Sequence, residues 1–142
     1  REKHLLCQPP WEGIDDPEPD APNLEREDRV LCADQVYTGR LWAAGAGTDD
    51  DDWYLISPRQ AGELRLELLV PKRGKGDYDL FLYVDPNGLA TVASRNRANI
   101  DESIQLPGQS PGRYWIRVWA QGKEVESPYQ LRWTLVPAAG AR

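Results

Sequence analysis

The sequence of 142 residues has few of the side chains that carry catalysis or bind transition metals. It contains one histidine, His4, and two cysteines, Cys7 and Cys32. A Ser-His-Asp or Cys-His arrangement needs a histidine placed on the scaffold, and a structural zinc site needs about four closely spaced ligands. His4 has no recognisable nucleophile nearby, and the two cysteines lie far apart in the chain. We therefore expect no catalytic residues and no enzyme activity.

Long apolar runs, basic blocks and phosphate-binding loops are also missing. The longest apolar stretches are a few residues long, whereas a helix that spans a bilayer needs roughly 20 apolar residues. Lysine and arginine form no concentrated block of the kind that binds nucleic acid. No glycine-rich loop leads into a helix start. These absences predict no membrane insertion and no nucleic-acid partner.

Acidic side chains are concentrated in the first third of the chain. Residues 1–52 carry 14 acidic and 5 basic side chains, a net charge of −9, whereas residues 53–142 carry 9 and 12, a net charge of +3. Five prolines fall between residues 9 and 22. Proline fixes φ and removes a backbone hydrogen-bond donor, so this composition disfavours both helix and sheet. We expect residues 1–34 to form an irregular acidic arm.

Beyond the arm, apolar side chains recur with the period of two that is typical of β-strands. Leu64, Leu66 and Leu68 alternate with charged residues, and turn sequences such as Asp85-Pro86-Asn87-Gly88 separate the alternating segments. We expect strands near 36–44, 52–57, 63–70, 78–85, 89–94, 102–106, 113–120 and 128–136. This pattern predicts an all-β fold, an antiparallel jelly-roll-like β-sandwich over residues 35–137 with a short tail at 138–142.

The two cysteines both lie in the acidic arm. A disulfide between Cys7 and Cys32 would restrict the unfolded chain and hold down an arm that has few other means of docking. Two buried free thiols are the alternative. Because disulfides persist in oxidising compartments, the first interpretation predicts a secreted, periplasmic or cell-surface protein.

Four motifs follow one another along the chain. They are the acidic entry segment Asp16–Asp20, the strand start Asp49–Tyr54, the segment Gly76–Tyr83 with the turn Asp85–Gly88, and the segment Ser110–Val118 with the closing strand Tyr129–Leu131. Taken in this order, they resemble the bacterial pre-peptidase C-terminal domain family, a relative of the collagen-binding domains of clostridial collagenases. The resemblance implies a β-sandwich attached to a secreted protease, another exoenzyme or a surface protein. It also implies a non-catalytic accessory module that assists secretion, stability or substrate attachment.

The acidic clusters indicate a calcium site. Calcium binds about 6–8 oxygen atoms, and successive aspartates repel one another unless a cation or solvent screens them. By position in the family motifs, the resemblance implies ligands at Asp16, Glu18, Asp20, Asp49 and Asp52, with the Trp53 carbonyl as an additional ligand. A bound ion would dock the arm and stabilise the folded domain. The alternative is a solvated acidic arm beside an acidic loop.

Aromatic side chains that alternate with the core positions form a second candidate site. Trp115 and Trp119 alternate with arginines on one strand, and Phe81 and Tyr83 share such a face on another. Surfaces of this kind stack on sugars and peptides. They predict, as an alternative function, a polysaccharide- or peptide-binding module that attaches to an extracellular polymer. In the collagen-binding relatives a second binding tyrosine falls at Gln121, and this departure argues against collagen binding.

Two further interpretations of the aromatic positions remain open. The acidic arm or an adjoining domain would cover the rings in a purely structural module. A structural subunit or ectodomain of a larger extracellular assembly would use the same face for a neighbouring protein.

Overall fold

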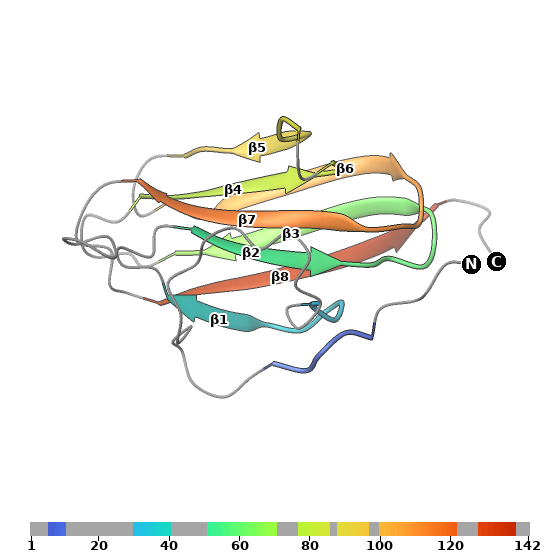
Figure 1. Cartoon of the computed structure of the whole chain (residues 1–142), viewed down its shortest axis with the longest axis horizontal. Helices are drawn as coiled ribbons and strands as arrows, with labels where there is room; N and C mark the ends of the chain where they lie inside the picture. Colours follow the sequence, from blue (N-terminus) through green and yellow to red (C-terminus); the bar gives the residue numbers. More distant parts are fainter. Residues whose placement is uncertain are drawn as a thin grey trace.

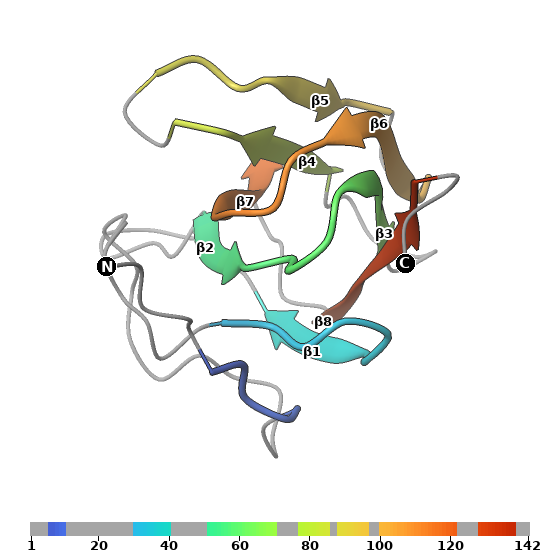
Figure 2. The ribbon, with the colours of Figure 1, turned by 90° about the vertical axis from the view of Figure 1, so that its right-hand side faces the viewer.

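The computed structural model describes residues 6–10, 30–40, 51–70, 77–85, 88–96, 100–121 and 128–138, and these residues form two packed antiparallel sheets (Figure 1). The strands are β1 (Tyr37–Arg40), β2 (Asp51–Ile56), β3 (Gly62–Leu69), β4 (Asp77–Tyr83), β5 (Val92–Ser94), β6 (Glu102–Gln109), β7 (Tyr114–Gln121) and β8 (Pro128–Pro137). One sheet has the order β1-β8-β3-β6, and the other has the order β2-β7-β4-β5. Figure 2 shows the two layers from the side. The all-β sandwich predicted from the sequence is confirmed.

Alternation along the strands decides which side chains fill the space between the sheets. In β3, Leu64, Leu66 and Leu68 are fully buried, whereas Arg65 and Glu67 face solvent. A pleated strand directs successive side chains to opposite faces, so one set reaches the core. The other long strands follow the same rule, and Val92 of the short β5 packs against the core from its edge. Within the described ranges, no helix is long and apolar enough to cross a membrane.

Two short segments of the acidic arm extend the sheet that contains β2. Val30 pairs with Leu55 of β2 in a parallel bridge, and Gln8 pairs with Leu31 in the same way. The Leu31 amide donates to the Leu55 carbonyl at 2.9 Å, and the Gln8 amide donates to the Val30 carbonyl at 2.9 Å. The arm segments therefore lie along the outer side of an edge strand.

The predicted disulfide joins these two arm segments. Cys7 and Cys32 are bonded across a sequence separation of 25. The Cys32 amide donates to the Tyr37 hydroxyl of β1 at 2.7 Å, and the indole Nε1 of Trp133 in β8 donates to the Leu31 carbonyl at 2.9 Å. Since β1 and β8 belong to the opposite sheet, the arm contacts both layers of the sandwich.

Candidate functional site

The structure covers part of the predicted calcium site. The predicted ligands outside the described residues are Asp16, Glu18, Asp20 and Asp49. The described pair, Asp52 and Trp53, belongs to β2. Their side chains take opposite sides of the sheet, with Asp52 in the interior and Trp53 on the outer face. Among the residues that the structure describes, no group of three or more His, Cys, Asp or Glu side chains could hold a metal ion.

Asp52 is a buried carboxylate between the two sheets. Its exposed fraction is 0%, and its Oδ2 accepts a hydrogen bond from the Tyr129 hydroxyl of β8 at 2.6 Å. The Tyr129 hydroxyl is also hydrogen-bonded to the Tyr54 hydroxyl of β2. A buried charge is stable only when hydrogen bonds or opposite charges replace its hydration. The hydroxyl contact therefore connects this predicted ligand to the opposite sheet.

The Tyr129 side chain occupies space left by a glycine on β1. A Cβ at Gly39 would overlap the Tyr129 hydroxyl, and the two residues are directly paired between β1 and β8. Burial raises the pKa of Tyr129 well above its usual value, and the Asp52 carboxylate raises this pKa further. The hydroxyl therefore stays protonated and remains a donor to Asp52 at neutral pH.

Aromatic rings surround Arg117 on the outer face of the second sheet. The register places Trp53 of β2 and Phe81 of β4 on either side of Arg117 in β7. The guanidinium carbon of Arg117 lies 5.6 Å from the Trp53 ring centroid, 5.7 Å from that of Phe81 and 5.5 Å from that of Trp119. A cation within about 6 Å of a ring centroid is attracted by the ring quadrupole. We call these four residues the aromatic cluster.

The predicted binding residues differ in their accessibility. Phe81 and Trp119 are half-buried, and their ring centroids lie 6.3 Å apart. Tyr83 is only 7% exposed because its ring packs 5.0 Å from that of Trp53 and 6.5 Å from that of Phe81. Phe81 and Trp119 therefore offer more of their surface to a ligand than Tyr83 does.

Trp115 lies toward the side of the sheet that the arm contacts. It pairs in register with Tyr83 and packs against a small buried cluster of Val30 and Leu55. Val30 belongs to the arm, and Leu55 is only 3% exposed beneath it. One end of the predicted binding face is thus in contact with the acidic arm.

A buried acid and an exposed arginine border the aromatic cluster. Asp79 of β4 is 1% exposed and lies opposite Trp119 in the register. Its Oδ2 is 3.5 Å from Nε of Arg95, whose guanidinium carbon lies 5.9 Å from the Phe81 ring centroid. Arg95 therefore connects the carboxylate to the rim of the aromatic surface.

No protein-family model matches the chain, and no curated protein matches it. Solved structures do match the chain, among them the crystal structure of the pre-peptidase C-terminal domain of a collagenase from Bacillus anthracis. The sequence identity is 16% and the TM-score is 0.57, over 75% of this chain and 93% of that chain. At this identity the likeness establishes a shared fold. The β-sandwich implied by the sequence resemblance is therefore confirmed.

Two members of the site are not evident from the sequence motifs. The motifs predict only a carbonyl ligand at Trp53, whereas the structure places its ring in the aromatic cluster. The alternation of Trp53 with the buried Asp52 and Tyr54 is the signal that identifies this outward direction. The contact between Asp52 and Tyr129 joins residues 77 positions apart, and no local pattern connects them.

Proposed function

We propose that this chain is a non-catalytic accessory domain of a larger extracellular protein, attached to a protease or another exoenzyme. The observation that carries the proposal is the sandwich fold, which is shared over 93% of a domain that belongs to a collagenase. The Cys7–Cys32 disulfide supports an oxidising, extracellular location. The domain would contribute stability, secretion competence or substrate attachment to its parent protein.

The proposal includes stabilisation by calcium. The carboxylate oxygens of the acidic run at residues 49–52 are the kind of ligand that a hard cation such as calcium binds. The last of these four aspartates is the buried Asp52. When bound, calcium would supply positive charge that offsets the repulsion within this run. Asp16, Glu18, Asp20, Asp49 and Asp52, with the Trp53 carbonyl, are the proposed ligands. Tyr129 would hold Asp52 in position through the hydrogen bond that its hydroxyl donates to Oδ2.

Calcium is expected to raise the thermal unfolding midpoint relative to a chelator. At a calcium concentration of about 100 times the dissociation constant, binding to the folded state alone adds about 2.7 kcal/mol. For a domain of this size, that gain corresponds to a rise of roughly 8 °C. Differential scanning calorimetry in calcium chloride and in EGTA, at matched ionic strength, measures the difference.

Two single substitutions make the calcium experiment specific. Asp49→Asn should remove most of the calcium-dependent rise, whereas Asp85→Asn removes the same charge from an exposed turn and should retain it. Identical midpoints of the wild-type chain in calcium and in EGTA would show that the acidic clusters hold no stabilising ion.

A second candidate function is attachment to an extracellular polymer through the aromatic cluster. The observation that favours it is the half-exposed pair Phe81 and Trp119 beside Arg117, whose guanidinium lies over both rings. Aromatic and arginine side chains contribute most of the binding energy in many interfaces. Polysaccharide or extended peptide is the ligand class that this surface suits.

Trp119→Ala is expected to weaken polymer attachment about thirtyfold, by roughly 2 kcal/mol, if the aromatic cluster is the contact surface. Depletion binding to insoluble polysaccharides and protein fibres measures the affinity. Leu69→Ala is the matched control because Leu69 is 46% exposed on β3 of the other sheet. Equal losses for the two variants, or no retention of the wild-type chain, would contradict this second function.

A further inference from the structure

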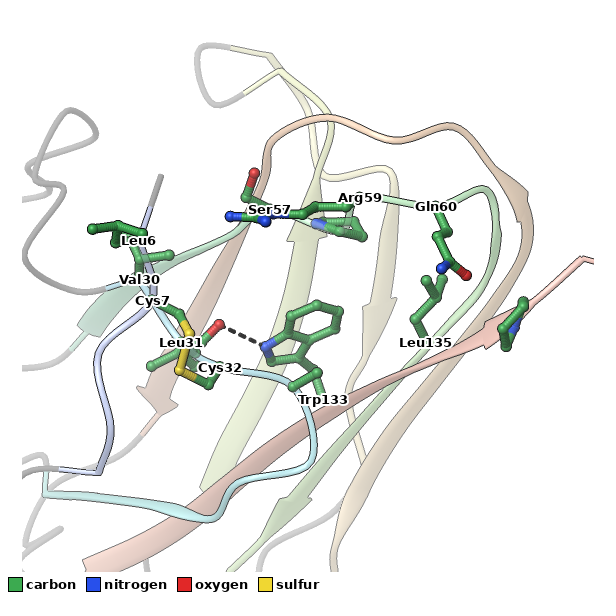
Figure 3. Close-up of a pocket in the computed structure, with 13 residues that line it drawn as sticks. Leu6, Cys7, Val30, Leu31, Cys32, Ser57, Arg59, Gln60, Trp133 and Leu135 are labelled. Carbon is green, nitrogen blue, oxygen red and sulfur yellow. Dashed lines mark hydrogen bonds between the residues drawn. A yellow bond between two sulfur atoms is a disulfide. The ribbon is translucent and has the colours of Figure 1, made fainter. Parts of the chain in front are cut away.

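A cavity of about 450 Å³ lies between the acidic arm, the connection from β2 to β3, and the C-terminal half of β8. Figure 3 shows the indole of Trp133 on one side of the cavity and Arg59 with Ser57 across from it. The disulfide between Cys7 and Cys32 lies beside the indole. Sites for small molecules typically have volumes of about 300–1,000 Å³, so the cavity is large enough for such a ligand.

Hydrogen bonds and the disulfide fix the walls of this cavity. Trp133 is 5% exposed, and its Nε1 donates to the Leu31 carbonyl. The Trp133 carbonyl accepts a hydrogen bond from the Asp34 amide at 2.8 Å. The covalent bond between Cys7 and Cys32 keeps the two arm segments together. Because these contacts already hold the walls in place, the protein would need little rearrangement to bind a ligand.

The described part of the lining is mostly apolar and includes one charged side chain. The apolar side chains include Leu6, Val30, Leu31, Pro58, Leu135 and Pro137. Among the described residues that line the cavity, Arg59 is the one charged side chain, and it is exposed. No carboxylate among the residues that the structure describes forms an ion pair with Arg59. An apolar pocket with a cation at its edge is complementary to an apolar molecule that carries a negative charge.

We propose that this cavity binds a small amphiphilic carboxylate, whose apolar part packs on Trp133 and whose carboxylate pairs with Arg59. A guanidinium donates two parallel hydrogen bonds to a carboxylate, and this geometry orients the ligand with its apolar part toward the indole. A fatty acid and the apolar C-terminal residue of a peptide share this chemistry. The site is distinct from the aromatic cluster, and the proposal requires neither calcium nor polymer attachment.

The test follows the indole N–H resonance of Trp133 in the full ¹⁵N-labelled chain during titration with decanoate. Trp133→Phe identifies the resonance. In the wild-type chain the resonance should shift saturably as decanoate is added. Arg59→Gln should weaken decanoate binding about tenfold, because the charged hydrogen bonds are lost. Arg65→Gln removes an exposed arginine of β3 and should leave the affinity unchanged.

Further ligands separate the contribution of the apolar part from that of the carboxylate. They also distinguish the two sources of carboxylate. Decanol tests the apolar part alone, and its affinity should not respond to Arg59→Gln. An acetylated tripeptide that ends in leucine, compared with its C-terminal amide, tests recognition of a chain terminus. Tighter binding of decanoate assigns the cavity to aliphatic acids, and tighter binding of the peptide acid assigns it to chain termini. A Trp133 resonance that moves with neither carboxylate, or equal decanoate affinity of the wild-type and Arg59→Gln chains, overturns the proposal.

Discussion

Replacing both Cys7 and Cys32 with serine is expected to lower the free energy of unfolding by about 3 kcal/mol. The bond closes a loop across a sequence separation of 25, and its removal gives the unfolded chain more conformations. In the folded state, the segment around Gln8 would then depend on two hydrogen bonds: the Gln8 amide donates to the Val30 carbonyl, and the Gln8 carbonyl accepts from the Tyr37 hydroxyl. Urea denaturation of the wild-type chain and the double variant measures the difference.

Reduction of the wild-type chain provides an independent comparison for the disulfide. A reducing agent should lower the urea midpoint of the wild-type chain toward that of the double variant, and it should leave the variant itself unchanged. If the oxidised wild-type chain and the double variant unfold at the same urea concentration with the same slope, the disulfide contributes nothing to stability.

Tyr129→Phe is expected to destabilise the domain by about 2–3 kcal/mol, although the ring and its packing are retained. The substitution removes the hydrogen bond to the buried Asp52 carboxylate, and hydrogen bonds to charged groups contribute about 1.5–3 kcal/mol. Tyr114→Phe is the matched control, because that hydroxyl donates to the neutral Ser110 carbonyl and its loss should cost about 1 kcal/mol. Urea denaturation at pH 7 compares the two variants.

The raised pKa of Tyr129 predicts how the stability of the domain depends on pH. The folded state raises the pKa of Tyr129, so above about pH 10 the unfolded chain loses this proton while the folded chain keeps it. Stability is therefore fully present below about pH 10 and falls as pH rises, by up to roughly 1.4 kcal/mol per pH unit for one group. Burial also raises the pKa of Tyr37 and Tyr114, which act in the same direction. Tyr129→Phe should show a shallower decline between pH 10 and 11; an unchanged slope would contradict the assignment.

The sandwich could be predicted because each long strand carries its own pattern. In β3 and β8 the alternation of apolar and polar side chains specifies which face is buried, and turn residues mark the ends. The bounds of shorter strands are harder to predict from the sequence. The expected strand at 89–94 is reduced to Val92–Ser94, because the chain bends at Gly88 and again at Thr91 before it runs straight beside β4.

The candidate site was harder to predict because it depends on contacts between strands. Alternation alone places Phe81 and Trp119 on an outer face, but only the register of β2, β7 and β4 shows that Trp53 and Arg117 complete the aromatic cluster. The cavity beside Trp133 combines residues from the arm, the connection after β2 and β8. No periodic pattern connects segments so far apart. The sequence therefore indicates neither the cavity nor the position of Arg59 in its lining.

The pairing of the arm with β2 also affects how the domain meets other copies of itself. An uncovered edge strand presents backbone N–H and C=O groups with which a second chain can form a sheet, and this is a common route to aggregation. Here Val30 and Leu31 cover the edge at Leu55, and Gln8 adds one further bridge. The next two residues are exposed prolines, which have no N–H to offer another strand. The arm thus ends the sheet with residues that resist its extension, and the disulfide keeps this protection against edge-to-edge association in place.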